Sequence, residues 1–347
     1  MMVKSTMIFY ILFSQLLQTA TSKQANVTSI NQWPMIMAHD AATTYLEDGG
    51  IINPWAKTQQ SGGTTGMLNC GARAFDWRPS LQKDGSLIMH HSSILVKHNM
   101  SGAVDEIVEW VGLNHNGARD LVILGITDCD GGSACNTAVE KLLGTHNITI
   151  VTVADLASMT AQDAVERGRL ANGGALLACE SCWQENYESY VTCSGFGSGS
   201  GNVDSGDDLT LESSSTTLTK SNTNANVNAN ANAVESLTYS CYTDSSNKAI
   251  PLDRMWQYLN NISKAGPPED GRLYTAQALW QESSAAVAIG TLHGSNLLKD
   301  ESKSSLNALL AQRITAGQWN VSNINMVEIN NVCDGGNNLK KVLDSIP

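Results

Sequence analysis

Short apolar runs alternate with amphipathic stretches along most of this chain. Runs that are apolar throughout are typical of strands buried on both faces of a parallel sheet, and apolar residues at helical spacing between them predict covering helices. The predicted strands are residues 34–38, 72–77, 86–89, 121–126, 175–179, 274–279 and 325–329. The clearest predicted helices are residues 104–113, 134–143 and 304–314.

This repeated alternation predicts an α/β fold, and the length of the chain favours a (β/α)8 barrel of the TIM type, regular or irregular, over an open sheet. Seven strands are evident, and an eighth depends on a weaker pattern near residues 237–242.

Residues 194–233 break the pattern. They are rich in Gly, Ser, Asn and Thr and contain the run Asn224-Ala-Asn-Val-Asn-Ala-Asn-Ala-Asn232. Because such a segment has little apolar surface to bury, we expect it to be disordered at the surface. The alternation resumes after it, which favours an insertion in one domain, residues 23–347, over a linker between two domains.

Residues 1–22 have the layout of a secretory signal peptide. An early lysine precedes an apolar run at residues 7–17, and small residues follow at 20–22. The run is short for a membrane span, although an uncleaved signal anchor is the alternative. Five Asn-x-Ser/Thr sequons accompany it: Asn26, Asn99, Asn147, Asn261 and Asn320. We therefore expect a secreted, extracellular glycoprotein.

The eight cysteines of the chain fit that oxidising compartment. Cys129 and Cys135 flank a short loop and are the easiest pair to connect. Cys182, Cys193 and Cys241 could close the base of the insertion, whereas Cys179-x-x-Cys182 could instead be a redox or metal pair. The sequence does not decide the remaining connectivity.

The formal net charge of −12 argues against nucleic-acid partners and against a polybasic grip on anionic lipid. Contact with a membrane would then be transient and would rest on apolar loops or on a few local cations. Trp33, Trp55 and Trp183 could be interfacial anchors, or they could pack in the core. The pattern does not indicate an oligomeric state.

Side chains suited to acid–base chemistry stand at the ends of three predicted strands. His39 follows the first strand, and alternate positions of the second place Asp76 and Arg78 on one face. By the same parity His91 points with the apolar face of residues 87–91, and His90 points away. Because barrel active sites lie at the carboxyl ends of the strands, we expect these side chains to converge, together with Asp40.

Two imidazoles and a guanidinium can cleave a phosphodiester without a metal. One imidazole removes a proton from a hydroxyl, the other protonates the leaving oxygen, and the guanidinium neutralises charge on the phosphate. The alternative is structural, since a histidine at a strand end is often a hydrogen-bonded filler and an Asp–Arg pair is often a simple ion pair.

Three motifs carry a family resemblance: Met37-Ala-His-Asp-Ala-Ala-Thr43, Gly71-Ala-Arg-Ala-Phe-Asp-Trp-Arg78 and Leu87-Ile-Met-His-His91. In this order they resemble the catalytic X region of phosphatidylinositol-specific phospholipases C, in the metal-independent bacterial and fungal-type branch. The resemblance is strong over residues 36–127, weaker at 273–310 and 325–335, and absent in the insertion.

The resemblance implies that His39 is the general base on the inositol 2-hydroxyl and that His91 is the general acid toward the glycerol oxygen. Asp40 would be the carboxylate partner of His91, and Arg78 would stabilise the developing charge. The calcium-dependent branch carries two carboxylates where this chain has Asp76 and Arg78, and a fixed cation there would repel a metal ion. We therefore expect no metal and no cofactor.

The chain departs from the family pattern at three places. The family has a Lys after the fourth strand and an Arg after the fifth, where this chain has Asp128 and Glu180, the predicted substrate-binding positions. The family also pairs its first histidine with an Asp on the last strand. Glu328 is the first choice for that partner here, with Asn330 and Asp334 as alternatives.

The expected function is that of a secreted phosphoric diester hydrolase acting on a phosphatidylinositol-type lipid or a related diester. The missing cations leave open a barrel phosphodiesterase with a non-inositol substrate. A third alternative is a catalytically silent secreted binding protein that kept the barrel.

Overall fold

The computed structural model describes residues 24–50, 52–115, 117–184, 192–193, 252–282, 284–292 and 294–346. The predicted signal peptide, the Asn/Ser-rich insertion, the weak strand near 237–242 and Cys241 lie outside these residues.

Eight strands form one sheet, in the order β7-β8-β6-β2-β1-β13-β11-β9, and every pairing in it is parallel. The strands are β1 (Met35–Ala38), β2 (Ala72–Trp77), β6 (Val122–Ile126), β7 (Thr149–Val151), β8 (Leu176–Glu180), β9 (Trp183–Gln184), β11 (Leu273–Gln277) and β13 (Met326–Ile329). Within the described ranges no ladder joins β7 to β9, so the predicted TIM-type barrel is present in an irregular form.

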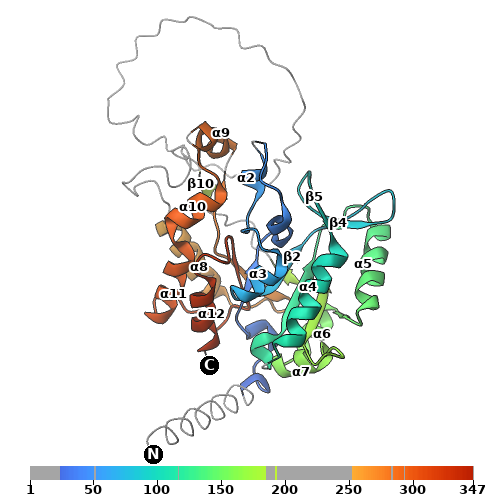
Figure 1. Cartoon of the computed structure of the whole chain (residues 1–347). Coiled ribbons are helices and arrows are strands. Elements are labelled where there is room, and N and C mark those ends of the chain that lie inside the picture. The colour runs from blue at the N-terminus through green and yellow to red at the C-terminus, as the bar shows by residue number, and fades with distance from the viewer. Residues whose placement is uncertain are drawn as a thin grey trace, which may run out of the picture.

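Helices flank the strands on both sides, with α4 to α7 on one side and α8 and α10 to α12 on the other (Figure 1). The α-helices are α2 (Asn53–Ala56), α3 (Gly63–Asn69), α4 (Met100–Leu113), α5 (Ser133–Thr145), α6 (Val153–Ser158), α7 (Ala161–Arg167), α8 (Leu252–Ala265), α9 (Ser284–Leu292), α10 (Leu297–Ser304), α11 (Leu306–Thr315) and α12 (Gly336–Asp344). Three 3-10 turns add η1 (Ile30–Gln32), η2 (Ala41–Tyr45) and η3 (Ala118–Asp120).

The strand predicted at residues 86–89 does not belong to the barrel. It is β4 (Leu87–His91), the middle strand of an antiparallel sheet with β3 (Pro79–Leu81) and β5 (Ile94–Asn99). Buried residues of β4 are interrupted by half-buried ones, whereas β1, β2 and β6 are buried throughout. A half-exposed pattern is typical of antiparallel sheets, which is the signal that separates this hairpin from the barrel strands. A two-stranded ladder of β10 (Thr192–Cys193) and β12 (Gln281–Glu282) completes the strands.

The sheet separates two apolar cores. Outward side chains such as Phe75 and Leu124 pack in a core shared with the helices, including Ile107 and Leu310. Inward side chains such as Met37 belong to a second core that fills the barrel. Alternate strand residues feed the two cores, which explains why the barrel strands read as uninterrupted apolar runs.

Three disulfides are found among the described cysteines. Cys129–Cys135 confirms the predicted loop pair, and Cys70–Cys333 joins distant parts of the chain. Cys182 bonds to Cys179 rather than to the base of the insertion, so that expectation was wrong for Cys182. The two cysteines of the Cys-x-x-Cys motif are simply close enough to bond to each other.

Trp33, Trp55 and Trp183 are buried, so they pack in the fold and do not present their rings as anchors. All five sequon asparagines are exposed. Among the described helices, none combines the length and apolar character that a bilayer span needs.

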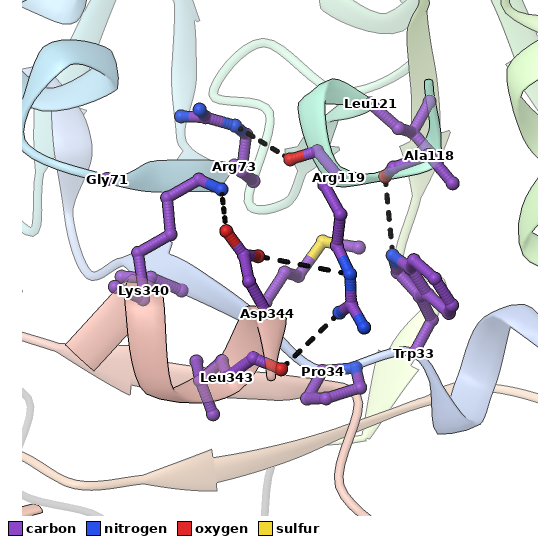
Figure 2. A pocket seen from close by; sticks show the side chains of 12 residues that line it. Trp33, Pro34, Gly71, Arg73, Ala118, Arg119, Leu121, Lys340, Leu343 and Asp344 are labelled. Atoms are coloured by element: carbon purple, nitrogen blue, oxygen red, sulfur yellow. Dashed lines mark hydrogen bonds and ion pairs between the residues drawn. The ribbon is translucent and has the colours of Figure 1, made fainter. Parts of the chain in front are cut away.

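Charged residues close the amino-terminal end of the barrel (Figure 2). The Arg119 guanidinium lies 3.8 Å from the Trp33 ring centroid, and it donates to the carbonyls of Leu343 and Ile346 at 3.4 and 3.0 Å. Lys340 pairs with Asp344 beside it. These contacts attach α12 to the base of the barrel, at the end opposite the predicted site.

Candidate active site

The carboxyl ends of β1, β2 and β4 bring the predicted polar side chains together. His39 and Asp40 follow β1, Asp76 is the penultimate residue of β2, Arg78 follows it, and His91 ends β4. Asp40 adopts a left-handed backbone conformation with φ 41°, and its N–H donates to Asp76 Oδ2 at 3.3 Å. That turn directs the chain into η2 and aims the Asp40 carboxylate back at its neighbours.

Asp40 is the centre of the cluster. Its Oδ2 lies 3.3 Å from His39 Nε2 and 3.2 Å from His91 Nε2, and its Oδ1 lies 3.2 Å from Arg78 Nε. The sequence assigned this carboxylate to His91 alone. One carboxylate therefore faces two imidazoles and a guanidinium.

Charge balance keeps that carboxylate ionised. Asp40 is buried, and burial alone would raise its pKa. The positive charges of His91, His39 and Arg78 outweigh burial and hold the pKa of Asp40 well below its usual range. A permanent negative charge at this point stabilises an imidazolium on either side of it.

Asp76 holds Arg78 in place. The Arg78 Nη2 donates to Asp76 Oδ2 at 2.9 Å, as the shared strand face predicted. Thr127, the first residue after β6, donates its hydroxyl to Asp76 Oδ1 at 3.3 Å. Sequence reasoning missed Thr127, although its place at a strand end was a signal.

The two adjacent histidines of β4 point in different directions, as parity predicted. His91 Nδ1 donates to the carbonyl of Ala56 at 2.9 Å, which leaves Nε2 facing Asp40. His90 lies between the carbonyls of Ser92 and Asp128, at 2.9 and 2.8 Å. His90 therefore connects β4 to the backbone at Ser92 and Asp128, whereas His91 belongs to the cluster.

The partner of His39 is Asn330 and not Glu328, the first choice from the sequence. His39 Nδ1 lies 2.9 Å from Asn330 Oδ1. In the parallel register Glu328 lies opposite Met37, one step deeper in the barrel, so its carboxylate is buried below the level of the cluster. Asp334 lies further along the chain, beyond the end of β13, and Asn330 occupies the position next to His39.

A buried segment next to the cluster, residues 56–59, contacts both histidines. Besides the Ala56 carbonyl on His91, the Thr58 hydroxyl donates to the carbonyl of His39 at 2.8 Å. Gln59 Nε2 donates to the same carbonyl at 3.0 Å and to that of Ile329 at 3.1 Å. Neither residue was singled out from the sequence, because nothing in a loop sequence shows which carbonyls it will reach.

Asp128 and Glu180, the two predicted substrate-binding residues, do not direct their side chains into the cluster. Glu180 accepts from Asn136 Nδ2 at 2.8 Å on the outer face of β8, so it points toward α5 and away from the cluster. Parity explains this result, because Ala178 of the outer core shares its face. Asp128 lies beside the cluster only through its backbone carbonyl, which binds His90.

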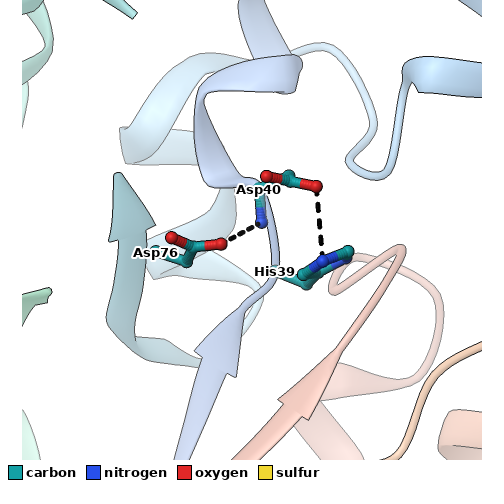
Figure 3. A group of neighbouring side chains, drawn as sticks. All are labelled: His39, Asp40 and Asp76. Atoms are coloured by element: carbon teal, nitrogen blue, oxygen red, sulfur yellow. Dashed lines mark hydrogen bonds and ion pairs between the residues drawn. The ribbon is translucent and has the colours of Figure 1, made fainter. Parts of the chain in front are cut away.

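Three donor residues lie close enough to hold one metal ion: His39, Asp40 and Asp76, with ligand atoms within 4.8 Å of one another (Figure 3). However, Arg78 contacts an oxygen of each carboxylate. A fixed positive charge on both carboxylates opposes a metal ion between them. The donor set therefore fits the Arg78 guanidinium better than a metal ion.

Hydrogen-bond partners assign the proton positions. A backbone carbonyl only accepts, so the Ala56 contact places a hydrogen on His91 Nδ1, and Nε2 carries a proton only as part of an imidazolium. Asp40 stabilises that form. Arg78 and His91 are also the more open members of the cluster, with side chains 21% and 20% exposed against 8% for His39. An anion would therefore meet the guanidinium and a proton donor first.

Comparison with known proteins shows a likeness of fold. No family model and no curated protein matches the chain. Solved structures of a phosphatidylinositol-specific phospholipase C from Staphylococcus aureus do match. One, on modulation of its membrane binding, has a TM-score of 0.52 and 14% identity, covering 94% of this chain and 96% of that one. Two mutants have TM-scores of 0.53 and 0.51, each at 14% identity over 94% of this chain and 95% and 97% of theirs.

Proposed function

We propose that this protein is a phosphoric diester hydrolase of the phospholipase C type. The observation that carries the proposal is the position of Asp40 Oδ2 between the Nε2 atoms of two imidazoles, with Arg78 on its other oxygen. Acid, base and charge-stabilising groups thus surround a single point. The fold shared with phosphatidylinositol-specific phospholipase C supports the same conclusion.

The proposed reaction begins at His39 Nε2, which removes the proton of a hydroxyl next to the phosphate. The hydroxyl oxygen forms a bond to phosphorus, and Arg78 neutralises the charge that builds on the phosphoryl oxygens. The bond from phosphorus to the leaving oxygen breaks, and His91 Nε2 supplies that oxygen with a proton. Asp40 stabilises the His91 imidazolium before the step and the His39 imidazolium after it.

A phosphatidylinositol-type lipid is the first proposed substrate. The residues that stand where that family has cationic inositol contacts do not supply them, since Glu180 points outward and Asp128 is acidic. This specific difference favours, as the second candidate, a diester with another headgroup. The catalytic step is the same for both.

The deciding experiment measures release of water-soluble phosphate ester from phosphatidylinositol vesicles in excess EDTA. We expect cleavage by the purified protein and losses of about 10²–10⁴-fold in His39→Ala and in His91→Ala. His146→Ala is a matched control, because the His146 ring pairs with the exposed Asp105 at 3.5 Å and has no part in the cluster. Its activity should equal that of the unaltered protein.

Other outcomes separate the alternatives. Cleavage that requires added calcium or magnesium would contradict the role given to Arg78. Activity retained in both histidine variants would overturn the acid–base assignment. If no phosphodiester of any headgroup is cleaved, the protein is a silent binding barrel.

We also propose that the protein is secreted and glycosylated, with transient contact to lipid surfaces. The disulfides and the exposed sequons support export. Recovery of the protein from culture medium, with a mass that falls on enzymatic deglycosylation, would test this. Retention of an unmodified protein inside the cell would contradict it.

A further inference from the structure

The side chain of Asn330 connects His39 to a buried carboxyl on another element. Asn330 Nδ2 lies 3.2 Å from the carbonyl of Trp280 and 2.8 Å from Glu301 Oε1. Glu301 is on α10, and the same oxygen accepts from the backbone N–H of Trp280 at 3.1 Å. His39, Asn330 and Glu301 therefore form a continuous chain of hydrogen bonds, and all three residues are buried.

This chain fixes which way the amide faces. Both neighbours of Asn330 Nδ2 are acceptors, so its two hydrogens point at Trp280 and Glu301 and its oxygen must face His39. An amide oxygen cannot donate, so His39 Nδ1 carries the hydrogen. In the neutral ring the other nitrogen, Nε2, then has the lone pair that a general base needs. The Asp40 carboxylate, 3.3 Å from Nε2, stabilises the imidazolium that forms once Nε2 has taken a proton.

Glu301 can fill this role in either protonation state. Burial raises the pKa of Glu301 to about 8, with the charges of Asp300 and Asp334 adding to the rise and the bonds to Trp280 and Asn330 opposing it. When the carboxyl is neutral its carbonyl oxygen still accepts, so Oε1 holds the amide with or without the charge.

We propose that Glu301 is a positioning residue, which acts through Asn330 to keep the neutral His39 ring protonated on Nδ1 and its Nε2 available as a base. Glu301 touches neither substrate nor the reacting atoms. The inference rests on the proposed function only for its effect on rate. The effect on the His39 ring is independent of any reaction.

The test follows the His39 ring nitrogens by 15N NMR, with the signal assigned by its absence in His39→Ala. In the unaltered protein we expect the neutral ring to carry its proton on Nδ1. Glu301→Gln keeps an acceptor oxygen and should preserve that tautomer. Glu301→Met removes the shorter of the two acceptor contacts and leaves only the Trp280 carbonyl at 3.2 Å, so the amide is held less firmly. Part of the proton should then redistribute to Nε2, and kcat should fall about 10–100-fold with KM little changed.

A double variant provides the rescue. A carboxylate accepts through both oxygens and has no amide hydrogens, so its orientation toward His39 no longer depends on Glu301. Adding Asn330→Asp to Glu301→Met should therefore restore the Nδ1 proton, a result that general damage to the fold could not produce. If Glu301→Met does not fold, Glu301→Leu, which also lacks an acceptor, is tested in the same way.

Asp300→Asn is the matched control, because Asp300 is equally buried on α10 but bonds to Ser295 and not to Asn330. It should leave the tautomer unchanged. An unchanged tautomer and kcat in Glu301→Met would overturn the inference. Loss of the Nδ1 proton in a protein that cleaves no diester would support the positioning role and count against the proposed function alone.

Discussion

The side chain of Asp40 contacts His39, His91 and Arg78, and its backbone adopts an unfavourable left-handed conformation. A non-glycine residue at φ 41° is uncommon, although aspartate tolerates this region better than most residues. The conformation persists because the Asp40 N–H bonds to Asp76 while the carboxylate contacts two imidazoles and a guanidinium. Strain at such a position is typical of functional sites.

Arg78 offers the clearest test at the level of a residue. We expect Arg78→Ala to reduce the rate of diester cleavage about 10²–10³-fold, because it removes the charge that stabilises the phosphoryl oxygens. Arg78→Lys should recover only part of that loss. A lysine cannot hold Asp40 and Asp76 in a planar fork while also meeting a phosphate. The measurement is kcat/KM in EDTA, and full activity in the lysine variant would contradict the role of the fork.

The alternation of side chains along the strands predicted most residues of the site. It did not predict which residue of the last strand lies at the level of His39. The five clustered residues, His39, Asp40, Asp76, Arg78 and His91, were all predicted, because their strand ends and faces can be read from the chain. Glu328 and Asn330 share one face, so parity cannot choose between them. The register of β13 against β1 decides it, and register depends on packing that no short motif contains.

At the level of elements, the buried residues 56–59 contact both histidines of the cluster. The segment contacts His91 through a carbonyl and the backbone of His39 through Thr58 and Gln59. It has no regular structure beyond the end of α2. A loop this deeply buried is unusual, because its polar groups need partners, and here those partners include His39 and His91 of the cluster.

Thr58→Val tests the contact between this segment and His39, because valine has nearly the same shape as threonine but lacks the hydroxyl. The variant loses the hydroxyl that donates to the His39 carbonyl, so we expect the free energy of unfolding to fall by about 1–3 kcal/mol. We also expect kcat to fall by up to about 10²-fold as His39 shifts. Thr315→Val, which removes a hydroxyl bonded to Ala311 on α11, is the control for lost hydrogen bonds. Equal kcat in the two variants would show that the segment only stabilises the fold.

The antiparallel sheet β3-β4-β5 contains a strand that the sequence predicted correctly but assigned to the wrong sheet. Residues 87–91 form a strand, and His91 reaches the cluster as parity required. The strand nevertheless pairs with its sequence neighbours outside the barrel, and β7 and β9 complete the parallel sheet instead. Those two strands are three and two residues long, too short for an apolar pattern to reveal them.

Over the whole molecule, buried carboxyl groups make the free energy of unfolding depend on pH, and two of them have opposite effects. The lowered pKa of Asp40 means that its charge stabilises the fold above the ordinary value of 3.8, and this contribution is lost as the pH falls below it. Burial raises the pKa of Glu282 to about 9, with Asp300 and Glu301 nearby adding to the rise. That group has the opposite effect.

Glu282→Gln should reduce the loss of stability in alkaline solution. Between pH 4.5 and about 9 the unfolded chain ionises Glu282 while the folded protein keeps it protonated, so stability falls as the pH rises through this window. A glutamine does not titrate and removes the dependence. We expect Tm to drop less between about pH 5 and about pH 9 in the variant than in the unaltered protein. Parallel Tm curves for the two proteins would contradict the raised pKa.

The pairing of β1 with β13 also sets an order of events during synthesis. β1 emerges early and can pair with β2, but its other edge has no partner until β13 follows almost three hundred residues later. The same late strand leads directly to Asn330, which orients His39. A nascent chain can thus carry His39, Asp40, Arg78 and His91 and still lack a properly oriented base. If the enzyme acts on membrane lipid, this order protects the lipids of the compartment in which the protein is made until translation is nearly complete.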